Sequence, residues 1–377
     1  GLSLNRPKLC PNATWNTTAQ TFATSSIVGS GPYTLFITSN NTIYAINQGT
    51  TTRIYIWDND SPTPTRNITG TGTTYGFFVI ENDKNDMYVD KGASSYKAEK
   101  WSFNSSTTTT MDSAMYMCDY CYTLFVDIKN NLYCSIYNRH MVIASSLNDR
   151  QSTWRVIAGT GTLGTTAVRL YYPRGIYVDT YFNLYDADYY GDRVQMFPFG
   201  QLNATTIIGN GPGSTIVGFV IDGPSEVVLD ANGYVYITDT WKHRILRVGP
   251  NTYECIVACT GAGATSSKLS YPNAISFDSF GNIYISDYSN NRIQKFGLLS
   301  DGCGKTYILN IQKKTRHLIN CFLSFIIIGV TTTTSTTTTS QNSEVTTSVT
   351  TSSSTTISYS NSKIVSDVDK IYEMIIF

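Results

Sequence analysis

The stretch PNAISFDSFGNIYISDYSNNRIQKFG, residues 272–297, divides into three short strands separated by two turns. Residues 274–278 alternate apolar with small or polar side chains, as a short strand should, and residues 283–286 and 292–296 are the second and third runs expected to form strands. Gly281 tolerates the positive φ that the first turn requires, and the residues after the second run are polar, as a second turn requires. The stretch is therefore predicted to be an antiparallel unit of three strands.

The same unit recurs along the chain. Clear copies begin at Pro224 (PSEVVLDANGYVYITDTWKHRILRVG) and Pro173 (PRGIYVDTYFNLYDADYYGDRVQMFPFG), and weaker copies begin at Cys121, Tyr75 and Tyr33. A tyrosine marks the same place in each copy: Tyr44, Tyr88, Tyr133, Tyr185, Tyr236 and Tyr284. Successive marker tyrosines are 44, 45, 52, 51 and 48 residues apart, a period typical of propeller blades rather than of helical solenoids.

A fourth strand is expected between units, where an apolar pair precedes Gly-x-Gly. It is expected at residues 154–162, 205–213, 254–263 and, in a looser form, 65–73, with residues 115–121 in the same slot without the glycines. A further copy, SIVGSGP at residues 26–32, precedes the first unit, whereas no fourth strand follows the last unit. Pairing these two ends would close a ring and hide its sheet edges. The predicted fold is all-β, a six-bladed β-propeller of four-stranded blades over residues 26–300, closed by this N-terminal strand.

The three clear copies resemble the NHL repeat, with its pattern P-x-G-I-x-V-D-x-x-G-N-I-Y-V-x-D-x-x-N-x-R-I. The three earlier units lack the proline and the Asp/Arg pair of this pattern. The resemblance implies a six-bladed propeller and no single function. Tripartite-motif ubiquitin ligases also carry NHL propellers, but the about 25 residues before this one hold a single cysteine and no RING or B-box zinc region, so ligase activity is not expected.

Composition and sequons favour an extracellular protein. Lys+Arg and Asp+Glu are both 27, so no basic surplus is present for nucleic-acid binding. Eight cysteines, an even number, fit an oxidising compartment. A seventh N-x-S/T sequon, at Asn59, is weakened by the proline that follows it. The six candidate N-glycosylation sites are Asn12, Asn16, Asn40, Asn67, Asn104 and Asn203.

Three cysteine pairs are candidates for disulfides. They are Cys121 with Cys134, Cys255 with Cys259, and Cys10 with Cys303. The first pair brackets a hairpin, the second lies on one strand and its turn, and the third flanks the two ends of the propeller, where a bridge would lock the closure. Connectivity cannot be deduced from sequence, so other pairings stay open.

The segments outside the propeller have their own composition. Residues 1–25 are interpreted as an N-terminal extension and residues 301–330 as a linker. The linker's apolar stretch, residues 318–330, is 13 residues long, and a spanning helix needs about 20, so membrane association through it is not favoured. Residues 331–360 contain 14 Thr and 9 Ser and are interpreted as a disordered stalk, followed by a tail at 361–377.

Repeated carboxylates are interpreted as structural. Each clear copy has an aspartate that ends its second strand and an arginine that begins its third, which we expect to stabilise the turn between them. These pairs are Asp188 with Arg193, Asp239 with Arg244, and Asp287 with Arg292. The aspartates that end the first strands are expected to accept hydrogen bonds from turn amides: Asp127, Asp179, Asp230 and Asp278. Calcium in the central channel stays open as an alternative, although DANG at residues 230–233 lacks the further acidic ligands of a calcium loop.

The chain shows no concentrated catalytic set. Only His140 and His243 lie in the expected propeller, and two histidines on separate blades cannot form a three-His zinc site. H-E-x-x-H and G-x-S-x-G are absent, and the glycines at 159–164 recur in other blades as turn residues. No catalytic residue, metal ligand or cofactor is assigned.

The leading hypothesis is therefore a non-catalytic extracellular scaffold that binds a protein or glycan through loops on one propeller face. Aromatic residues in the turns after the second strands are candidate anchors: Tyr189, Tyr190, Trp241 and Tyr288. Packing between blades is the competing interpretation of these four side chains. The alternative function is a calcium-dependent hydrolase or lyase with its site in the central channel.

Overall fold

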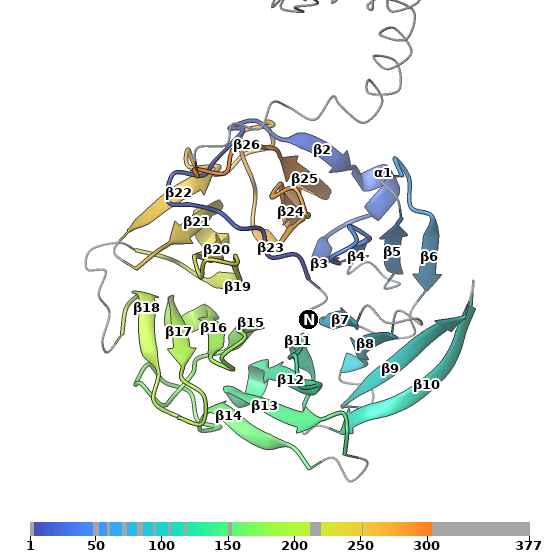
Figure 1. Cartoon of the computed structure of the whole chain (residues 1–377), viewed down its shortest axis with the longest axis vertical. Coiled ribbons are helices and arrows are strands. Elements are labelled where there is room, and N and C mark those ends of the chain that lie inside the picture. The colour runs from blue at the N-terminus through green and yellow to red at the C-terminus, as the bar shows by residue number, and fades with distance from the viewer. Residues whose placement is uncertain are drawn as a thin grey trace, which may run out of the picture. The chain divides into compact units, whose positions relative to one another are not determined.

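The propeller has six blades, each an antiparallel sheet of four strands, arranged around a central channel (Figure 1). The innermost strand of each blade contacts the innermost strands of both neighbouring blades, so the ring is closed. The computed structural model describes residues 4–47, 53–58, 61–69, 74–80, 86–92, 96–104, 107–116, 119–149, 153–211, 220–250 and 252–303. The predicted all-β, six-bladed fold is confirmed.

Five blades take their four strands from consecutive chain, ordered from the channel to the rim. The first blade is β3 (Pro32–Ile37), β4 (Ile43–Asn47), β5 (Arg53–Trp57) and β6 (Arg66–Thr69). The second is β7 (Phe77–Ile80), β8 (Asp86–Asp90), β9 (Lys97–Asn104) and β10 (Thr107–Tyr116). The third is β11 (Cys121–Val126), β12 (Asn131–Ile136), β13 (Met141–Ser146) and β14 (Arg155–Gly159). The fourth is β15 (Pro173–Val178), β16 (Leu184–Asp188), β17 (Arg193–Phe197) and β18 (Thr205–Gly209). The fifth is β19 (Pro224–Leu229), β20 (Val235–Asp239), β21 (Arg244–Val248) and β22 (Tyr253–Val257).

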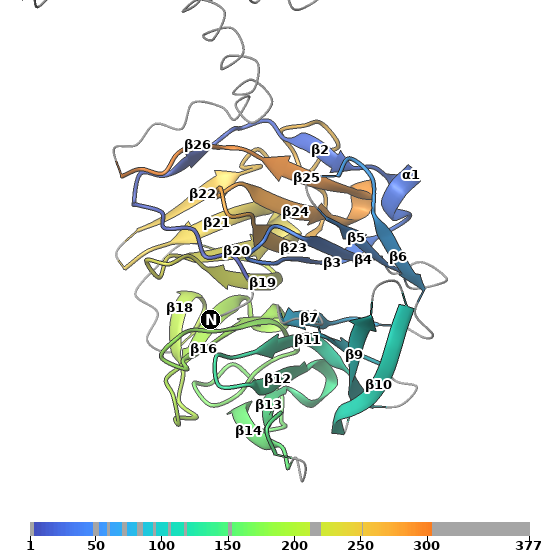
Figure 2. The same ribbon diagram turned by 45° about the vertical axis from the view of Figure 1, so that its right-hand side comes forward.

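The sixth blade combines the two ends of the propeller. Its inner strands are β23 (Pro272–Phe277), β24 (Ile283–Asp287) and β25 (Arg292–Phe296). Its outer strand is β2 (Gln20–Ala23), which pairs antiparallel with β25 (Figures 1 and 2). Closure by an N-terminal strand is thus confirmed.

The position of the closing strand differs from the prediction. Residues 26–32 do not pair with β25, because Ser25–Val28 form a single helical turn, α1, that ends at Gly29 with φ +71°. This turn buries Val28 in the core between the first and sixth blades, so the apolar pair of SIVGSGP packs from a helix rather than from a strand. The prediction for residues 26–32 is therefore wrong, and the ring begins at Gln20. Because β3 begins at Pro32, the first blade also keeps the proline that the repeat comparison did not assign to it.

The outer strand of the second blade also lies elsewhere than expected. The strand at this position is β10, Thr107–Tyr116, and not residues 115–121, because Cys121 already begins β11 of the next blade. β10 begins with four threonines, whose branched side chains favour extended backbone. The apolar pair and glycines that mark other outer strands are missing here. The preference of threonine for extended backbone favours the strand instead.

The marker tyrosines occupy one position of the second strand in all six blades. Each tyrosine pairs with one residue of the first strand of its own blade. In blade order these partners are Phe36, Phe78, Phe125, Tyr177, Val228 and Ser276. Prolines begin the first strands of the first, fourth, fifth and sixth blades, where a strand's first residue tolerates the loss of an N–H donor. Residues at the same place in successive repeats therefore occupy equivalent positions in successive blades.

The N-terminal segment is part of the propeller rather than an extension from it. Thr14–Trp15 (β1) pair with Leu298–Ser300 (β26), and Trp15 packs edge-on against Tyr236 and donates a 2.8 Å hydrogen bond to the Gly281 carbonyl. Residues 4–11, here called the strap, run from this edge to the channel at the ring's centre, where Leu4 bridges to Thr38 (Figure 1). Residues 14–15 and 20–23 of the segment interpreted as an N-terminal extension therefore pair with strands of the propeller.

The C-terminal predictions fall beyond this ring. The apolar stretch 318–330, the Thr/Ser-rich segment 331–360 and the tail 361–377 lie outside the described residues. Within the described part, no helix combines the length and apolar character that a membrane crossing requires.

Candidate functional site

The three predicted Asp/Arg pairs are ion pairs, with 2.7 Å between Arg Nε and Asp Oδ2 in each. They join Arg193 to Asp188, Arg244 to Asp239, and Arg292 to Asp287. The second carboxylate oxygen accepts a backbone N–H from the loop that leads into the same blade, at 2.5–2.8 Å. The guanidinium donates to carbonyls of that loop. Each pair therefore ties an incoming loop to a strand end, which is a structural arrangement.

The aspartates at the ends of the first strands organise the opposite turns. In Asp127, Asp179, Asp230 and Asp278, one oxygen accepts the backbone N–H groups two and four residues later. In the third and fifth blades the marker tyrosine hydroxyl donates to the other oxygen, at 2.9 and 3.3 Å. The predicted hydrogen bonds from turn amides are confirmed, and these oxygens already accept hydrogen bonds from groups of the propeller.

The two propeller histidines link neighbouring blades. His140 and His243 each follow a 3-10 turn in the left-handed conformation, and their Nδ1 atoms accept the N–H of Tyr172 (3.2 Å) and Tyr271 (3.0 Å) from the next blade. In two other blades an aspartate and an asparagine side chain accept an equivalent bond. Burial lowers the pKa of both histidines, which favours the neutral ring that can accept. Their geometry is that of a repeated structural contact.

The four candidate anchors lie on one propeller face, here called the mouth face, in the turns between second and third strands. Three of them touch: Tyr189, Tyr190 and Trp241 have ring centroids 4.9–6.2 Å apart. Tyr190 and Trp241 are 43% and 44% exposed, whereas Tyr189 is buried beneath them. Tyr288 lies on the same face and contacts Tyr33 at 5.9 Å.

A ring of side chains that sequence reasoning missed fills the channel mouth. Its six members are equivalent, because each lies three residues before the partner of a marker tyrosine. They are Tyr33, Tyr75, Tyr122, Arg174, Ser225 and Asn273, here called the mouth ring. Tyr122 reaches across the channel and donates to Asn273 Oδ1 at 3.3 Å. The signal that could have found this ring is the chemistry of one repeat position compared across the blades.

Aromatic contacts continue from the mouth ring to the exposed anchors. Tyr122 stacks on Tyr137, which packs on Tyr172, and Tyr172 packs on Tyr190, with centroid distances of 5.7, 4.5 and 5.3 Å. Tyr190 in turn contacts Trp241 at 6.2 Å. The mouth face therefore presents a continuous, laterally supported aromatic surface, and not four isolated side chains.

Arg174 lies at the centre of this surface. Its guanidinium carbon is 3.2 Å from the Tyr189 ring centroid and 4.7 Å from that of Tyr122, the geometry of cation–π contacts. Among the described residues it forms no ion pair, and its Nε has no hydrogen-bond partner. Burial raises the pKa of the Tyr122 hydroxyl, so this neighbour stays neutral beside the cation.

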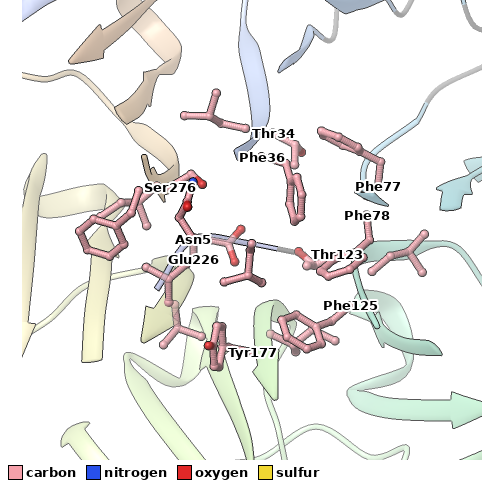
Figure 3. Close-up of a pocket in the computed structure, with 18 residues that line it drawn as sticks. Asn5, Thr34, Phe36, Phe77, Phe78, Thr123, Phe125, Tyr177, Glu226 and Ser276 are labelled. Atoms are coloured by element: carbon pink, nitrogen blue, oxygen red, sulfur yellow. The ribbon is translucent and has the colours of Figure 1, made fainter. Parts of the chain in front are cut away.

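Behind the mouth ring the channel narrows to a cavity of about 50 Å³, lined by the innermost strands of all six blades and by Leu4 and Asn5 of the strap (Figure 3). Glu226 is the carboxyl group among the lining residues. In the described part of the chain, no three His, Cys, Asp or Glu side chains are grouped closely enough to hold a metal. The alternative of a calcium-dependent channel enzyme thus gains no ligand set from these residues.

The structure shows which of the predicted cysteines are paired and which of the sequon asparagines are exposed. Disulfides join the three candidate pairs, Cys10–Cys303, Cys121–Cys134 and Cys255–Cys259. Asn16 is half-buried, and the side chain of Asn104 and the residue Asn59 lie outside the described set. The exposed sequon asparagines are Asn12, Asn40, Asn67 and Asn203.

Comparisons with known proteins identify the repeat and the fold. The family model of the NHL repeat matches residues 269–296. The fold is similar to a Bacteroides thetaiotaomicron VPI-5482 protein of unknown function, with TM-score 0.59, 15% identity, and 74% of this chain and 76% of that chain covered. It is also similar to selenomethionine-substituted virginiamycin B lyase from Staphylococcus aureus, with TM-score 0.50, 13% identity and coverage of 74% and 99%. No curated protein matches the sequence. At these identities the likeness shows the fold alone.

Proposed function

We propose that this six-bladed propeller, which carries an NHL repeat, is a non-catalytic recognition module that binds a protein or glycan through its mouth face. The observation that carries the proposal is the aromatic surface that runs from the mouth ring to Tyr190 and Trp241. Tyr, Trp and Arg are the residues most enriched at binding hot spots, because they offer large, rigid contact areas. A protein partner fits this composition better than a glycan.

The remaining conspicuous groups support binding over catalysis. The Asp/Arg pairs and the first-strand aspartates hold turns and loops, and His140 and His243 hold blades together. Each of these groups forms hydrogen bonds with the backbone that stabilise the propeller. The exposure of the aromatic surface, in contrast, has no such structural role. Its half-exposed rings are the feature that a binding role explains.

An extracellular location belongs to the same proposal. Three disulfides are typical of proteins that fold in an oxidising compartment. Four sequon asparagines are exposed and accessible to glycosylation: Asn12, Asn40, Asn67 and Asn203. Mapping occupied sequons on the native protein tests this location, and unmodified asparagines in protein from its natural source would argue against it.

The binding face is tested with matched variants of the full chain. The triple variant Tyr190→Ala, Trp241→Ala, Tyr288→Ala removes the exposed rings of the mouth face. The control variant Tyr181→Ala, Phe199→Ala removes rings that are 78% and 61% exposed on the opposite face. Because the mouth-face rings are only partly exposed and pack on neighbouring rings, thermal melts of both variants check that the propeller remains folded.

Both variants and the wild type are compared on arrays of extracellular proteins and glycans, followed by affinity measurement of the strongest ligand. We expect the mouth-face variant to lose about 30-fold or more in affinity, the loss that removal of a hot spot produces, and the control to keep it. Loss in the control with full retention in the mouth-face variant would place the binding surface on the opposite face.

A further inference from the structure

The cavity lies behind the mouth ring, and Leu4 and Asn5 of the strap form part of its wall. Asn5 is buried there and donates to the Thr38 carbonyl at 2.6 Å and to Asn41 Oδ1 at 3.3 Å. A volume of about 50 Å³ exceeds the share of one water molecule and suits a very small ligand group.

Four aromatic rings form an arc along one side of this cavity. Phe36, Phe78, Phe125 and Tyr177 stand at the same position of four successive blades, with neighbouring ring centroids 4.9, 5.0 and 5.2 Å apart. Figure 3 shows these rings around the opening into which Glu226 and Asn5 project. Aromatic rings grouped in this way attract cations through the negative charge of their faces.

Glu226 supplies the complementary carboxyl. At its place in the first strand the other blades carry threonine, glycine or alanine, so its size and charge are not required by the repeat. It receives a hydrogen bond from the Val227 backbone N–H, and within the described part of the chain it forms no ion pair. Burial raises the pKa of Glu226 to about 8, and the hydrogen bond from Val227, which favours the ionised form, offsets this only in part.

A second polar group in the cavity wall is the hydroxyl of Tyr177. The Tyr177 side chain is 1% exposed, and its hydroxyl has no hydrogen-bond partner among the described residues. Arg6 of the strap lies close enough to influence Tyr177, so this end of the channel already faces one cationic side chain. Buried polar groups left in this condition are costly, and a bound ligand would offset the cost.

We propose that the cavity is a binding site for an organic ammonium group, held by the carboxylate of Glu226 and by the aromatic arc, with the strap as part of its wall. A single carboxylate beside aromatic rings suits an alkylammonium ion better than calcium, which takes six to eight oxygen ligands. The site is separate from the mouth face, so variants of the exposed mouth-face rings leave ammonium binding unchanged.

The proposal is tested on the full chain with methylammonium chloride, which fits the cavity, in calorimetric titrations against equal concentrations of sodium chloride. The variant Glu226→Gln keeps the side-chain volume and removes the charge. Glu254→Gln, at an exposed glutamate of the same blade, is the matched control. Asn5→Gly removes both side-chain hydrogen bonds that hold the strap at the cavity.

We expect saturable binding of methylammonium, a loss of at least tenfold in Glu226→Gln and no change in Glu254→Gln. Because Glu226 is largely protonated at pH 7 and a bound ammonium favours its ionised form, binding should release a proton to the buffer and tighten as the pH rises to 8.5. Equal binding by Glu226→Gln, or saturation of the same site by calcium, overturns the proposal. So does absence of binding in both the wild type and Asn5→Gly, because the second variant removes the side chain with which the strap is held at the cavity.

Discussion

The disulfide between Cys10 and Cys303 joins the two ends of the propeller, and its removal should cost more stability than removal of either other disulfide. The three bridges differ in the length of chain that they close: their sequence separations are 293, 13 and 4 residues. A bridge stabilises the native state mainly by restricting the unfolded chain, and the restriction grows with the logarithm of the loop length.

The chain-entropy relation gives the magnitudes. At 25 °C it yields about 6 kcal/mol for the 293-residue loop, about 3 kcal/mol for the 13-residue loop and about 2 kcal/mol for the 4-residue loop. Cys121 and Cys134 are fully buried, so their replacement also loses packing, which works against the expected ranking and makes the comparison stricter.

The assay is urea unfolding of the wild type and of three double Cys→Ala variants, followed by tryptophan fluorescence and circular dichroism together. Coincident transitions and equal m-values are required before free energies are compared. We expect the midpoint to fall most in Cys10→Ala, Cys303→Ala and least in Cys255→Ala, Cys259→Ala. If these two variants unfold at the same urea concentration, closure of the long loop is not what the bridge contributes, and the noncovalent contacts of β2 and the strap hold the ring alone.

Three further predictions concern single side chains. Arg193→Met should destabilise the protein by about 3–5 kcal/mol in urea unfolding, because it leaves the fully buried carboxylate of Asp188 unpaired; a loss below 1 kcal/mol would contradict the buried ion pair. His140 accepts a hydrogen bond from Tyr172 as a neutral ring and burial lowers its pKa, so its contribution should be complete above pH about 6.5 and decline as the pH falls toward its folded pKa. Thermal melts from pH 7 to 5 should therefore fall more steeply for the wild type than for His140→Gln, and parallel curves would exclude this role. Asp186 is fully buried without a hydrogen-bond partner in the described structure, and the equivalent residue is isoleucine in the next two blades, so Asp186→Ile should raise stability at pH 7 by about 1–3 kcal/mol; a destabilised variant would reveal a role for the carboxyl.

Much of the ring can be predicted from the sequence because its information is local and repeated. The marker tyrosines recur once per blade and the Asp/Arg pairs in three of the blades, and each reports contacts made within a blade. The closing strand lies outside this repetition. Its assignment to residues 26–32 followed a glycine pattern, whereas β2 forms where Phe22 and Ala23 find apolar neighbours in the first and sixth blades.

Part of the candidate site could also be predicted from the sequence, and part could not. Tyr189, Tyr190, Trp241 and Tyr288 are visible in the sequence as aromatic residues in equivalent turns, and three of them do meet. The mouth ring and the ammonium cavity are not visible there, because their residues come from all six blades, at equivalent positions that are 42–52 residues apart and that differ in chemistry.

The sequence by itself thus determined the number of blades, their three inner strands and the cysteines available to lock the ring, because these depend on the period of the chain and on short-range preferences. Only the tertiary structure decided what stands at the centre. Closing the ring brings six first strands together, draws the strap across one end of the channel, and sets Glu226 opposite four aromatic rings. Such contacts between distant residues arise from the curvature of the whole ring, which no single repeat contains.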